Sequence, residues 1–369
     1  MLVVKVVSPL SSRESFTVLG EDDVPVAPVE RYLKYLTDIE RSPNTIKAYA
    51  HDLKDWFTFL GGRGLDWQSV SLEDIGAFVV WLRLPTALRQ GGIAVLPSVE
   101  HHCGESTVNR KLSALAAFYL HAVRDGIDVG ELLTTWQIGG SRGGWKPFLH
   151  HISKHMPSPR RTVSLKAPKK LPRVLTPGEV QTLLDACDRL RDRFLLALLY
   201  DAGMRIGEAL GLRHSDIAAA ERQVTVCRRD NDNRARAKSL TARIVPVSAE
   251  LIRLYADYLH AEYGDLDSDY VFVNLWGRPH GHPLTYGAVY DLVRRLRRRT
   301  AIDFDPHWLR HTAATRMLRD GIGLEVVAKL LGHANVTVTA ATYGHLNVED
   351  ARKAMEQAGW FIGKAQVKL

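Results

Sequence analysis

Residues 305–314, DPHWLRHTAA, place three polar side chains of possible chemical use on one probable helix. His307, Arg310 and His311 stand at i, i+3 and i+4, positions that share a helical face. A zinc site is disfavoured, because Trp308 occupies the place where H-E-x-x-H metalloproteases carry glutamate and Arg310 would repel a dication. A guanidinium fork with a neighbouring imidazole suits a phosphate instead. An ordinary helix with structural histidines is the alternative.

Three other segments supply further candidates. Arg205 lies in the apolar stretch DAGMRIGEALGLRHSDI, where an unpaired charge would be costly and Glu208 could neutralise it in a structural ion pair. His333 follows Gly332 in LLGHANV, and Tyr343 comes soon after it. A tyrosine in such a place is, on its own, most simply a packing residue.

Taken in order, these motifs resemble the tyrosine recombinases, which include phage-type integrases, Xer-like recombinases and related transposases. SPNTIKAYAHDL and NRKLSALAAFY are similar to the two characteristic helices of the family's N-terminal core-binding domain. TPGEV, GMRIGEALGLRHSDI, HWLRHTAATRML and LLGHANV resemble successive motifs of its catalytic domain. The resemblance spans nearly the whole chain.

The resemblance implies a mainly α fold with a small β-sheet. A helical, SAM-like core-binding domain would precede a catalytic domain of the DNA breaking-rejoining fold. We expect a short N-terminal extension with at most an extra strand (residues 1–24), a helical DNA-binding domain (25–130) and a basic linker (131–172). The catalytic domain would follow (173–349), and a C-terminal helix or tail (350–369) would dock on a neighbouring protomer.

Local signals agree with this division. Ser42 and Pro43 mark a helix start, and Thr176 with Glu179 forms a capping-box signature. Between residues 26 and 130, apolar residues recur at helical spacing in about four segments. RQVTVCRR and ARIVPVS have the β-branched content of strands, and they flank the polar loop DNDNRARAKSLT.

The resemblance also implies a catalytic lysine in this hairpin, usually eight residues before a proline. Counting back from Pro246 gives Lys238, the only lysine between Lys170 and Lys329. Lysine can give up a proton near neutral pH, whereas arginine cannot. A lone lysine on a flexible loop therefore suits a general acid, although a phosphate contact is the alternative.

The implied reaction is phosphoryl transfer without metal or nucleotide cofactor. Tyr343 would attack a DNA phosphodiester to give a 3′-phosphotyrosine and a free 5′-hydroxyl. Arg205 and Arg310 would neutralise the five-coordinate phosphorane. The remaining candidates would assist them: His307 donating to the phosphate or accepting the phenolic proton, His333 adding a hydrogen bond, Lys238 protonating the leaving oxygen, and Glu208 and His311 supporting the site.

Two features depart from the family's pattern. The family usually places its tyrosine nine residues after the Leu-Gly-His histidine, and here the interval from His333 to Tyr343 is ten. The hairpin loop is also longer than the compact, glycine-rich form usual in the family. The loops that carry Tyr343 and Lys238 are therefore expected to differ locally.

The charge distribution favours a nucleic-acid partner. The net charge is +8, and residues 132–178 contain nine lysines and arginines but no acidic residue. A second cluster of arginines occupies residues 294–299 and is expected close to DNA. Candidates for contact with DNA phosphates, for which a solvated surface is the alternative, are Lys47, Lys54, Arg110, Lys111, Arg160, Arg161, Lys169 and Lys170.

The remaining expectations concern location and partners. No apolar run approaches the ~20 residues that a membrane-spanning helix needs, and the three scattered cysteines fit a reducing cytoplasm. We expect a cytoplasmic, nucleoid-associated protein that binds double-stranded recombination sites. By resemblance it would self-associate, as a tetrameric synapse on DNA, with accessory DNA-bending or directionality proteins. The alternatives are a type IB topoisomerase and a non-catalytic DNA-binding relative.

Overall fold

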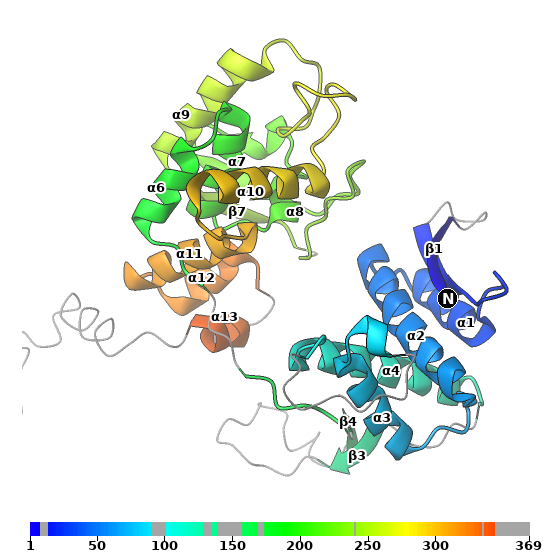
Figure 1. Ribbon diagram of the computed structural model, residues 1–369. Helices are drawn as coiled ribbons and strands as arrows, with labels where there is room; N and C mark the ends of the chain where they lie inside the picture. Colours follow the sequence, from blue (N-terminus) through cyan, green and yellow to red (C-terminus); the bar gives the residue numbers. More distant parts are fainter. Residues whose placement is uncertain are drawn as a thin grey trace, which may run out of the picture. The chain divides into compact units, whose positions relative to one another are not determined.

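The computed structural model describes residues 1–7, 14–89, 101–127, 134–138, 157–161, 163–168, 173–239, 241–333 and 336–343. The chain divides into two compact units, Met1–Lys169 and Lys170–Leu369 (Figure 1). Each unit has its own core of buried apolar side chains. Within the described residues, no helix is both long and apolar enough to cross a membrane.

The described part of residues 25–130 contains four α-helices, as expected: α1 (Ala27–Asp38), α2 (Pro43–Arg63), α3 (Leu72–Arg83) and α4 (Glu105–Arg124). Ser42 is the N-cap of α2 and Pro43 its first residue, as predicted. The apolar stripes of these helices meet in an aromatic core, where Trp56 packs edge-on against Phe78 at a centroid distance of 4.9 Å. Burial of these stripes is the main source of stability in such a bundle.

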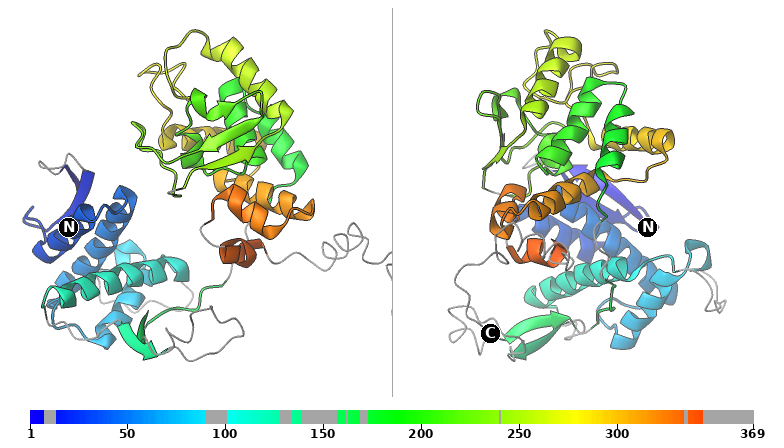
Figure 2. Two further views of the ribbon diagram at one scale, coloured as in Figure 1. Left: turned by 180° about the vertical axis from the view of Figure 1, so that it is seen from behind. Right: turned by 90° about the vertical axis from the view of Figure 1, so that its left-hand side faces the viewer.

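A hairpin precedes the bundle. Strands β1 (Leu2–Val7) and β2 (Glu14–Leu19) pair antiparallel, and β2 lies against α1 and α2 (Figure 2). The Ser15 hydroxyl is 2.7 Å from that of Thr37 on α1, and Val18 is fully buried. The N-terminal extension therefore forms two strands and joins the core of the first unit.

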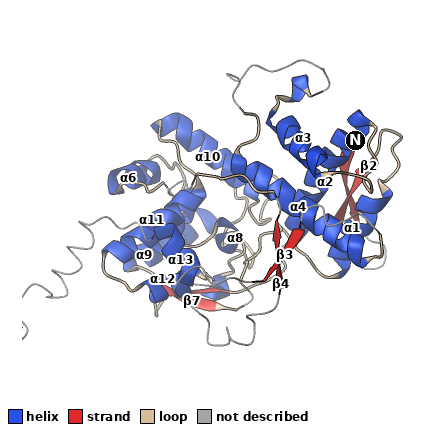
Figure 3. Ribbon diagram, turned by 90° about the horizontal axis from the view of Figure 1, so that it is seen from below, coloured by secondary structure: helices blue, strands red, loops and turns tan. Residues whose placement is uncertain are grey.

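The basic segment 131–172 has more structure than the sequence indicated. Strands β3 (Thr134–Ile138) and β4 (Pro157–Arg161) pair antiparallel (Figure 3). Further along, Val163 and Leu165 pack against the first core, and the Asn109 side chain both donates to and accepts from the Leu165 backbone at 2.8 Å. The segment expected as a basic linker therefore contains two paired strands and residues that pack on the first core.

The second unit is helical around a small sheet. The α-helices and strands of its described residues are α6 (Pro177–Asp185), α7 (Leu190–Asp201), α8 (Ile206–Ala209), β5 (Ile217–Ala218), β6 (Gln223–Val226), β7 (Arg243–Pro246), α9 (Ala249–Tyr258), α10 (Tyr286–Thr300), α11 (Pro306–Arg319), α12 (Leu324–Leu331) and α13 (Val336–Tyr343). The sheet is antiparallel in the order β5-β6-β7. Both predicted strands and the Thr176–Glu179 capping box are confirmed.

Helix α7 lies at the centre of this unit. Its side chains are buried on most sides, among them Phe194, Leu195 and Leu199, and it packs against both α9 and α11. A helix that is apolar nearly all round is typical of the middle of a domain. The turn after α7 carries Arg205, and α11 carries Arg310. The contact between α7 and α11 therefore holds the two arginines in one part of the structure.

Candidate active site

The turn between α7 and α8 positions Arg205, the first of the candidate residues along the chain. Gly203 has a φ of +61°, and a Cβ there would lie 2.9 Å from the Leu331 side chain and 3.4 Å from Ala313. Only glycine tolerates both the left-handed backbone and this close approach of α11 and α12. The turn places Arg205 at the N-cap of α8, where its backbone N–H donates to the Glu208 carboxylate at 2.9 Å.

Glu208 is a buried carboxylate shared by two arginines. Its side chain is fully buried, and it accepts from Arg205 Nη1 at 2.9 Å and from Arg243 Nη2 at 2.6 Å. Burial raises the pKa of Glu208, but hydrogen bonds and charge from Arg243 and Arg205 outweigh that effect and hold the pKa below its ordinary value. Glu208 is therefore ionised at neutral pH, and the predicted ion pair with Arg205 is present.

Arg310 lies beside this pair. Its side chain is 1% exposed, with Nη1 donating to the Gly203 carbonyl at 2.8 Å and Nη2 donating to the Leu331 carbonyl at 2.8 Å. Nη1 is also 4.0 Å from Glu208. Three guanidinium groups thus surround one carboxylate, which leaves a net charge of +2 in a largely buried cluster.

The three arginines converge on the C-terminal end of α12. The carbonyl of Leu330 accepts from Arg243 at 2.8 Å, that of Leu331 from Arg310, and that of Gly332 from Arg205 at 3.3 Å. The last carbonyls of a helix have no partner within it and carry the negative end of the helix dipole. Donation to them fixes the three guanidinium groups in place, so α12 serves as the scaffold of the cluster.

His333 follows α12 directly and faces Arg310. Its Nε2 is 2.9 Å from Arg310 Nη2, and its Nδ1 is 2.7 Å from the Thr339 hydroxyl on α13. A guanidinium can only donate, so Nε2 accepts and the ring proton sits on Nδ1, where it is donated to Thr339. Burial and the charge of Arg310 lower the pKa of His333 to about 4, which keeps the ring neutral.

His307 and His311 stack edge to face on α11 with ring centroids 4.4 Å apart. His307 is exposed in the first turn, and its backbone N–H donates to the N-cap residue Asp305 at 2.8 Å. Burial and nearby cations, Arg310 foremost, lower its pKa. Burial also lowers the pKa of His311, to about 4, with a further contribution from the His307 ring. His307 is thus the more open of the two.

Lys238 is exposed on the loop between β6 and β7. Its charge contributes to the lowered pKa of His307. Buried side chains lie on both sides of Arg234 in this loop. Ala235 is fully buried, and Asn233 is 9% exposed.

Tyr343 is the last residue of α13. The backbone of this helix is described, whereas the Tyr343 side chain lies outside the described part of the structure. Thr339, four residues earlier on the same helix, is fully buried and bonded to His333. The helix that ends at Tyr343 is therefore tied directly to the arginine cluster.

Two residues of the site were missed in the sequence. Arg243 was counted only as part of a strand, yet it shares Glu208 and bonds α12. Its neighbour Ile244 is 57% exposed while Val245 is 1% exposed, so Arg243 lies on the buried face. In the sequence, the alternation of a strand would have placed Arg243 on the same face as the apolar Val245. No sequence pattern pointed to Thr339, since its role depends on the fold around His333.

The proposed phosphate contacts of the first unit have different surroundings. Lys111 is 7% exposed, with its Nζ 3.1 Å from Asp52 and 2.7 Å from Asp55. Arg110 also pairs with Asp52, but half of its side chain is exposed. Lys111 is thus a structural ion-pair residue between α2 and α4, and we withdraw it as a phosphate contact.

The other basic candidates remain predictions. Lys47 is exposed, 5.9 Å from the centre of the Phe16 ring, and Lys54 lies 3.6 Å from Asp55 with a third of its side chain exposed. The backbone of Arg160 and Arg161 belongs to β4, but their side chains lie outside the described residues. Lys169 and Lys170 lie outside them altogether.

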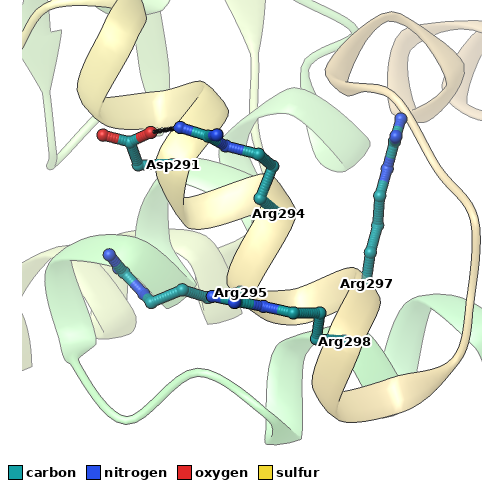
Figure 4. A pocket seen from close by; sticks show the side chains of 5 residues that line it. All are labelled: Asp291, Arg294, Arg295, Arg297 and Arg298. Carbon is teal, nitrogen blue, oxygen red and sulfur yellow. Dashed lines mark hydrogen bonds and ion pairs between the residues drawn. The ribbon is translucent and has the colours of Figure 1, made fainter.

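The arginines of α10 are mostly engaged within their own unit. Arg295 pairs with Asp192 at 3.5 Å, Arg297 donates to the Phe304 carbonyl at 2.8 Å, and Arg299 pairs with Asp188 at 2.6 Å. Figure 4 shows the side chains that line the adjoining pocket leaving the helix in different directions, with Arg294 turned toward Asp291. Their proximity to DNA stays a prediction, since acidic partners already balance much of this charge.

Removal of the Glu208 charge is expected to destabilise the second unit. Glu208→Gln keeps the shape but leaves buried guanidinium groups uncompensated, so the free energy of unfolding should fall by ~3 kcal/mol or more at pH 7. The stabilisation from a carboxylate with a lowered pKa is present above its ordinary pKa and is lost as the pH falls through the folded-state value. The difference between variant and wild type should therefore shrink below about pH 4.

Urea unfolding at pH 7 and at pH 3.5 measures both effects. Glu250→Gln is the matched control, because Glu250 and its partner Arg253 are each about three-quarters exposed. It should change stability by less than ~0.5 kcal/mol. Equal stabilities of Glu208→Gln and wild type at pH 7 would contradict a structural role for this carboxylate.

Lys111→Ala tests the revised role of Lys111. The buried Asp52 then keeps only the half-exposed Arg110 as a partner and Asp55 loses a bond of 2.7 Å, so we expect a loss of ~2 kcal/mol from the first unit in a thermal or urea unfolding experiment. Lys47→Ala, at an exposed site, should stay within ~0.5 kcal/mol of wild type. Unchanged stability with weakened DNA binding would return Lys111 to the phosphate contacts.

Comparison with known proteins identifies the family of this chain. Residues 173–350 match the family model described as the phage integrase family, and residues 29–126 match the phage integrase N-terminal SAM-like domain. The chain is 38% identical over 340 residues to transposase A from transposon Tn554 of Staphylococcus aureus, covering 91% of this chain and 92% of that protein. It is 27% identical over 338 residues to tyrosine recombinase XerC of Roseiflexus castenholzii, covering 88% and 90%.

The chain therefore belongs to the phage integrase family. It is a tyrosine recombinase, an enzyme of site-specific DNA recombination. These relatives do not favour the topoisomerase or the non-catalytic alternative.

Solved structures confirm the fold class. The chain is similar to the Tn1549 transposon integrase in complex with circular intermediate DNA, with a TM-score of 0.60 and 19% identity over 90% of this chain and 99% of that chain. It is also similar to a lambda integrase dimer bound to a core site, with a TM-score of 0.58 and 15% identity over 93% and 80%.

Proposed function

We propose that this recombinase cuts and rejoins double-stranded DNA through a 3′-phosphotyrosine at Tyr343, without a metal ion or a nucleotide. The observation that carries the proposal is the cluster of Arg205, Arg243 and Arg310 around a single carboxylate at the end of α12. Its excess positive charge suits the phosphorane that forms when an oxygen nucleophile attacks a phosphodiester. The next helix carries the tyrosine.

The step is an exchange of one phosphate ester for another. The phenolic oxygen of Tyr343 bonds to phosphorus, the bond from phosphorus to the 5′-oxygen breaks, and the energy of the ester is retained. His307, exposed and with a lowered pKa, accepts the phenolic proton or donates to the phosphate. Lys238 gives a proton to the departing 5′-oxygen. Attack by the 5′-hydroxyl of a second duplex reverses the step and exchanges strands.

Arg205 and Arg310 differ in how readily they can reach a phosphate. One fifth of the Arg205 side chain is exposed, whereas Arg310 is covered and donates to His333. A phosphate oxygen is a stronger acceptor for guanidinium than a neutral imidazole. We infer that His333 yields its hydrogen bond with Arg310 when DNA binds, and that His311 stays a scaffold residue of α11.

The partner and setting follow from the relatives and the charge. Relatives named as transposase and integrase support a role in moving a DNA element. We propose that Lys47, Lys54 and Arg110 are among the cations that contact its double-stranded sites. We propose a tetrameric synapse in which the C-terminal residues 350–369 dock on a neighbouring protomer, with accessory DNA-bending or directionality proteins, on cytoplasmic DNA. These residues lie outside the described part of the structure.

Covalent trapping tests the proposed chemistry. A duplex selected by the protein from a randomised pool is nicked at successive positions, so that cleavage releases a short fragment and traps the intermediate. With EDTA and without magnesium, we expect a detergent-stable protein–DNA adduct with a free 5′-hydroxyl on the released piece. Binding should weaken steeply with salt. Cleavage that needs a divalent ion, or that leaves no adduct, would contradict the proposal.

A further inference from the structure

The buried side chain of Asn233 bonds the loop between β6 and β7 to two other elements. Its Nδ2 donates to the carbonyls of Leu210 at 2.9 Å and Leu284 at 2.8 Å, and its Oδ1 accepts from the Ala235 N–H at 3.0 Å. Leu210 is the C-cap of α8, and Leu284 lies just before α10. A carboxamide with both donors and its acceptor engaged fixes the loop against two separate elements.

After Asn233 the chain turns at Arg234, whose φ is +60°, and buried residues continue up to the neighbour of Lys238. Asn233, Ala235 and Ala237 are buried, with exposed fractions of 9%, 0% and 7%, whereas Arg234 and Lys238 are exposed. Asn231 reinforces this run by donating to the Ala235 carbonyl at 2.8 Å. The last buried side chain before Lys238 is therefore that of Ala237, its immediate neighbour, and the exposed lysine stands at the end of a run that is fixed from Asn233 onward.

The start of the loop is fixed as well. Arg229 forms a two-pronged ion pair with Asp216, at 2.6 and 2.7 Å, and the Asp216 side chain is 4% exposed. The bond from Asn233 to Leu210 joins the loop to the C-cap of α8, the short helix that has Arg205 as its N-cap and contains Glu208. The loop and the arginine cluster thus share an element, which sets the place of Lys238 relative to the cluster.

We propose that Asn233 is a positioning residue for Lys238, holding the lysine where the 5′-oxygen departs. This inference rests on the proposed general-acid role of Lys238. In that step Lys238 Nζ loses a proton to the 5′-oxygen as its bond to phosphorus breaks, giving a 5′-hydroxyl and a neutral amine. Asn233 touches neither DNA nor the reacting atoms, and its effect is wholly through the loop.

A pair of DNA substrates separates positioning from folding. One carries the ordinary 5′-oxygen ester, and the other has sulfur in place of that bridging oxygen. A thiolate is a far better leaving group than an alkoxide, since thiols have a pKa near 8.5, so it departs without a general acid. Asn233→Ala should slow cleavage of the oxygen ester about 10- to 100-fold, which is a substantial part of the rate enhancement that a general acid contributes. Cleavage of the sulfur ester should stay within about threefold of the wild-type rate.

Lys238→Ala is expected to show the same difference between substrates. The double variant should cleave the oxygen ester no more slowly than Lys238→Ala alone, because Asn233 acts only through the lysine. Leu183→Ala is the folding control. Leu183 is 1% exposed on α6, and its loss should slow both substrates equally. If Asn233→Ala does not fold, Asn231→Ala, at a less buried position, should show the same selectivity to a smaller extent.

The outcomes are distinct. Equal slowing of both substrates by the Asn233 and Asn231 variants, or multiplicative effects with Lys238→Ala, would overturn the positioning role and leave the general acid intact. A Lys238→Ala defect that persists on the sulfur ester would contradict the general-acid role itself, and the positioning proposal with it.

Discussion

Tyr343→Phe is expected to bind DNA as wild type does and to form no covalent adduct. The substitution removes one hydroxyl and keeps the ring, so stability should change by no more than ~1 kcal/mol. Loss of a nucleophile lowers turnover by a factor on the order of 10⁴ or more. Adduct formation on the nicked duplex in EDTA, with DNA affinity measured in parallel, is the test.

Tyr290→Phe is the control for this variant. Tyr290 lies on α10 with 49% of its surface exposed, and it is the last tyrosine before Tyr343 in the sequence. Its hydroxyl has no part in the proposed step, so adduct formation should stay within about twofold of wild type. Adduct formation by Tyr343→Phe at the wild-type rate would remove Tyr343 from the mechanism.

Arg310→Lys is expected to give the second largest loss. Lysine keeps the positive charge but offers a point donor in place of a planar fork. Removal of one preorganised donor to a charged transition state typically lowers the rate about 10²- to 10³-fold. DNA affinity should change by less than about threefold, because Arg310 is 1% exposed and one buried contact adds little to a charge-driven interface.

The same helix provides the control. Arg316 on α11 is a third exposed, stacks on Tyr200 at 4.4 Å and lies 3.7 Å from Asp201, away from the cluster. Arg316→Lys should cleave DNA within about twofold of wild type. A rate for Arg310→Lys close to wild type, with the protein folded, would show that the fork of this arginine does not act on the phosphate.

The sequence predicted the parts of the site that local motifs encode. Arg205 with Glu208, and His307 with Arg310, each lie within one turn of helix, where spacing along the chain fixes proximity. Arg243 and Thr339 enter the site through tertiary packing. Ile244, the most apolar residue of β7, is exposed, so apolar content alone gave no sign of the buried arginine beside it.

Two other features were missed in the sequence for physical reasons of the same kind. Lys111 is basic and helical, but pairing of α2 with α4 buries it against two aspartates from another part of the chain. The segment PSPRR contains prolines, which cannot donate to a sheet, yet it forms β4 of a two-stranded sheet. Proline is tolerated on such edge strands, where half of the N–H groups need no strand partner.

The central claim is that Tyr343 becomes covalently bound to the DNA. Trypsin digestion of the trapped adduct should release the peptide 330–352, whose only tyrosine is Tyr343. Mass spectrometry after nuclease treatment should find a nucleotide bound through phosphate to Tyr343 in this peptide. In protein that was not exposed to DNA, the same peptide should be unmodified. A nucleotide on any other residue, or a free 3′-phosphate with no modified peptide, would contradict the account.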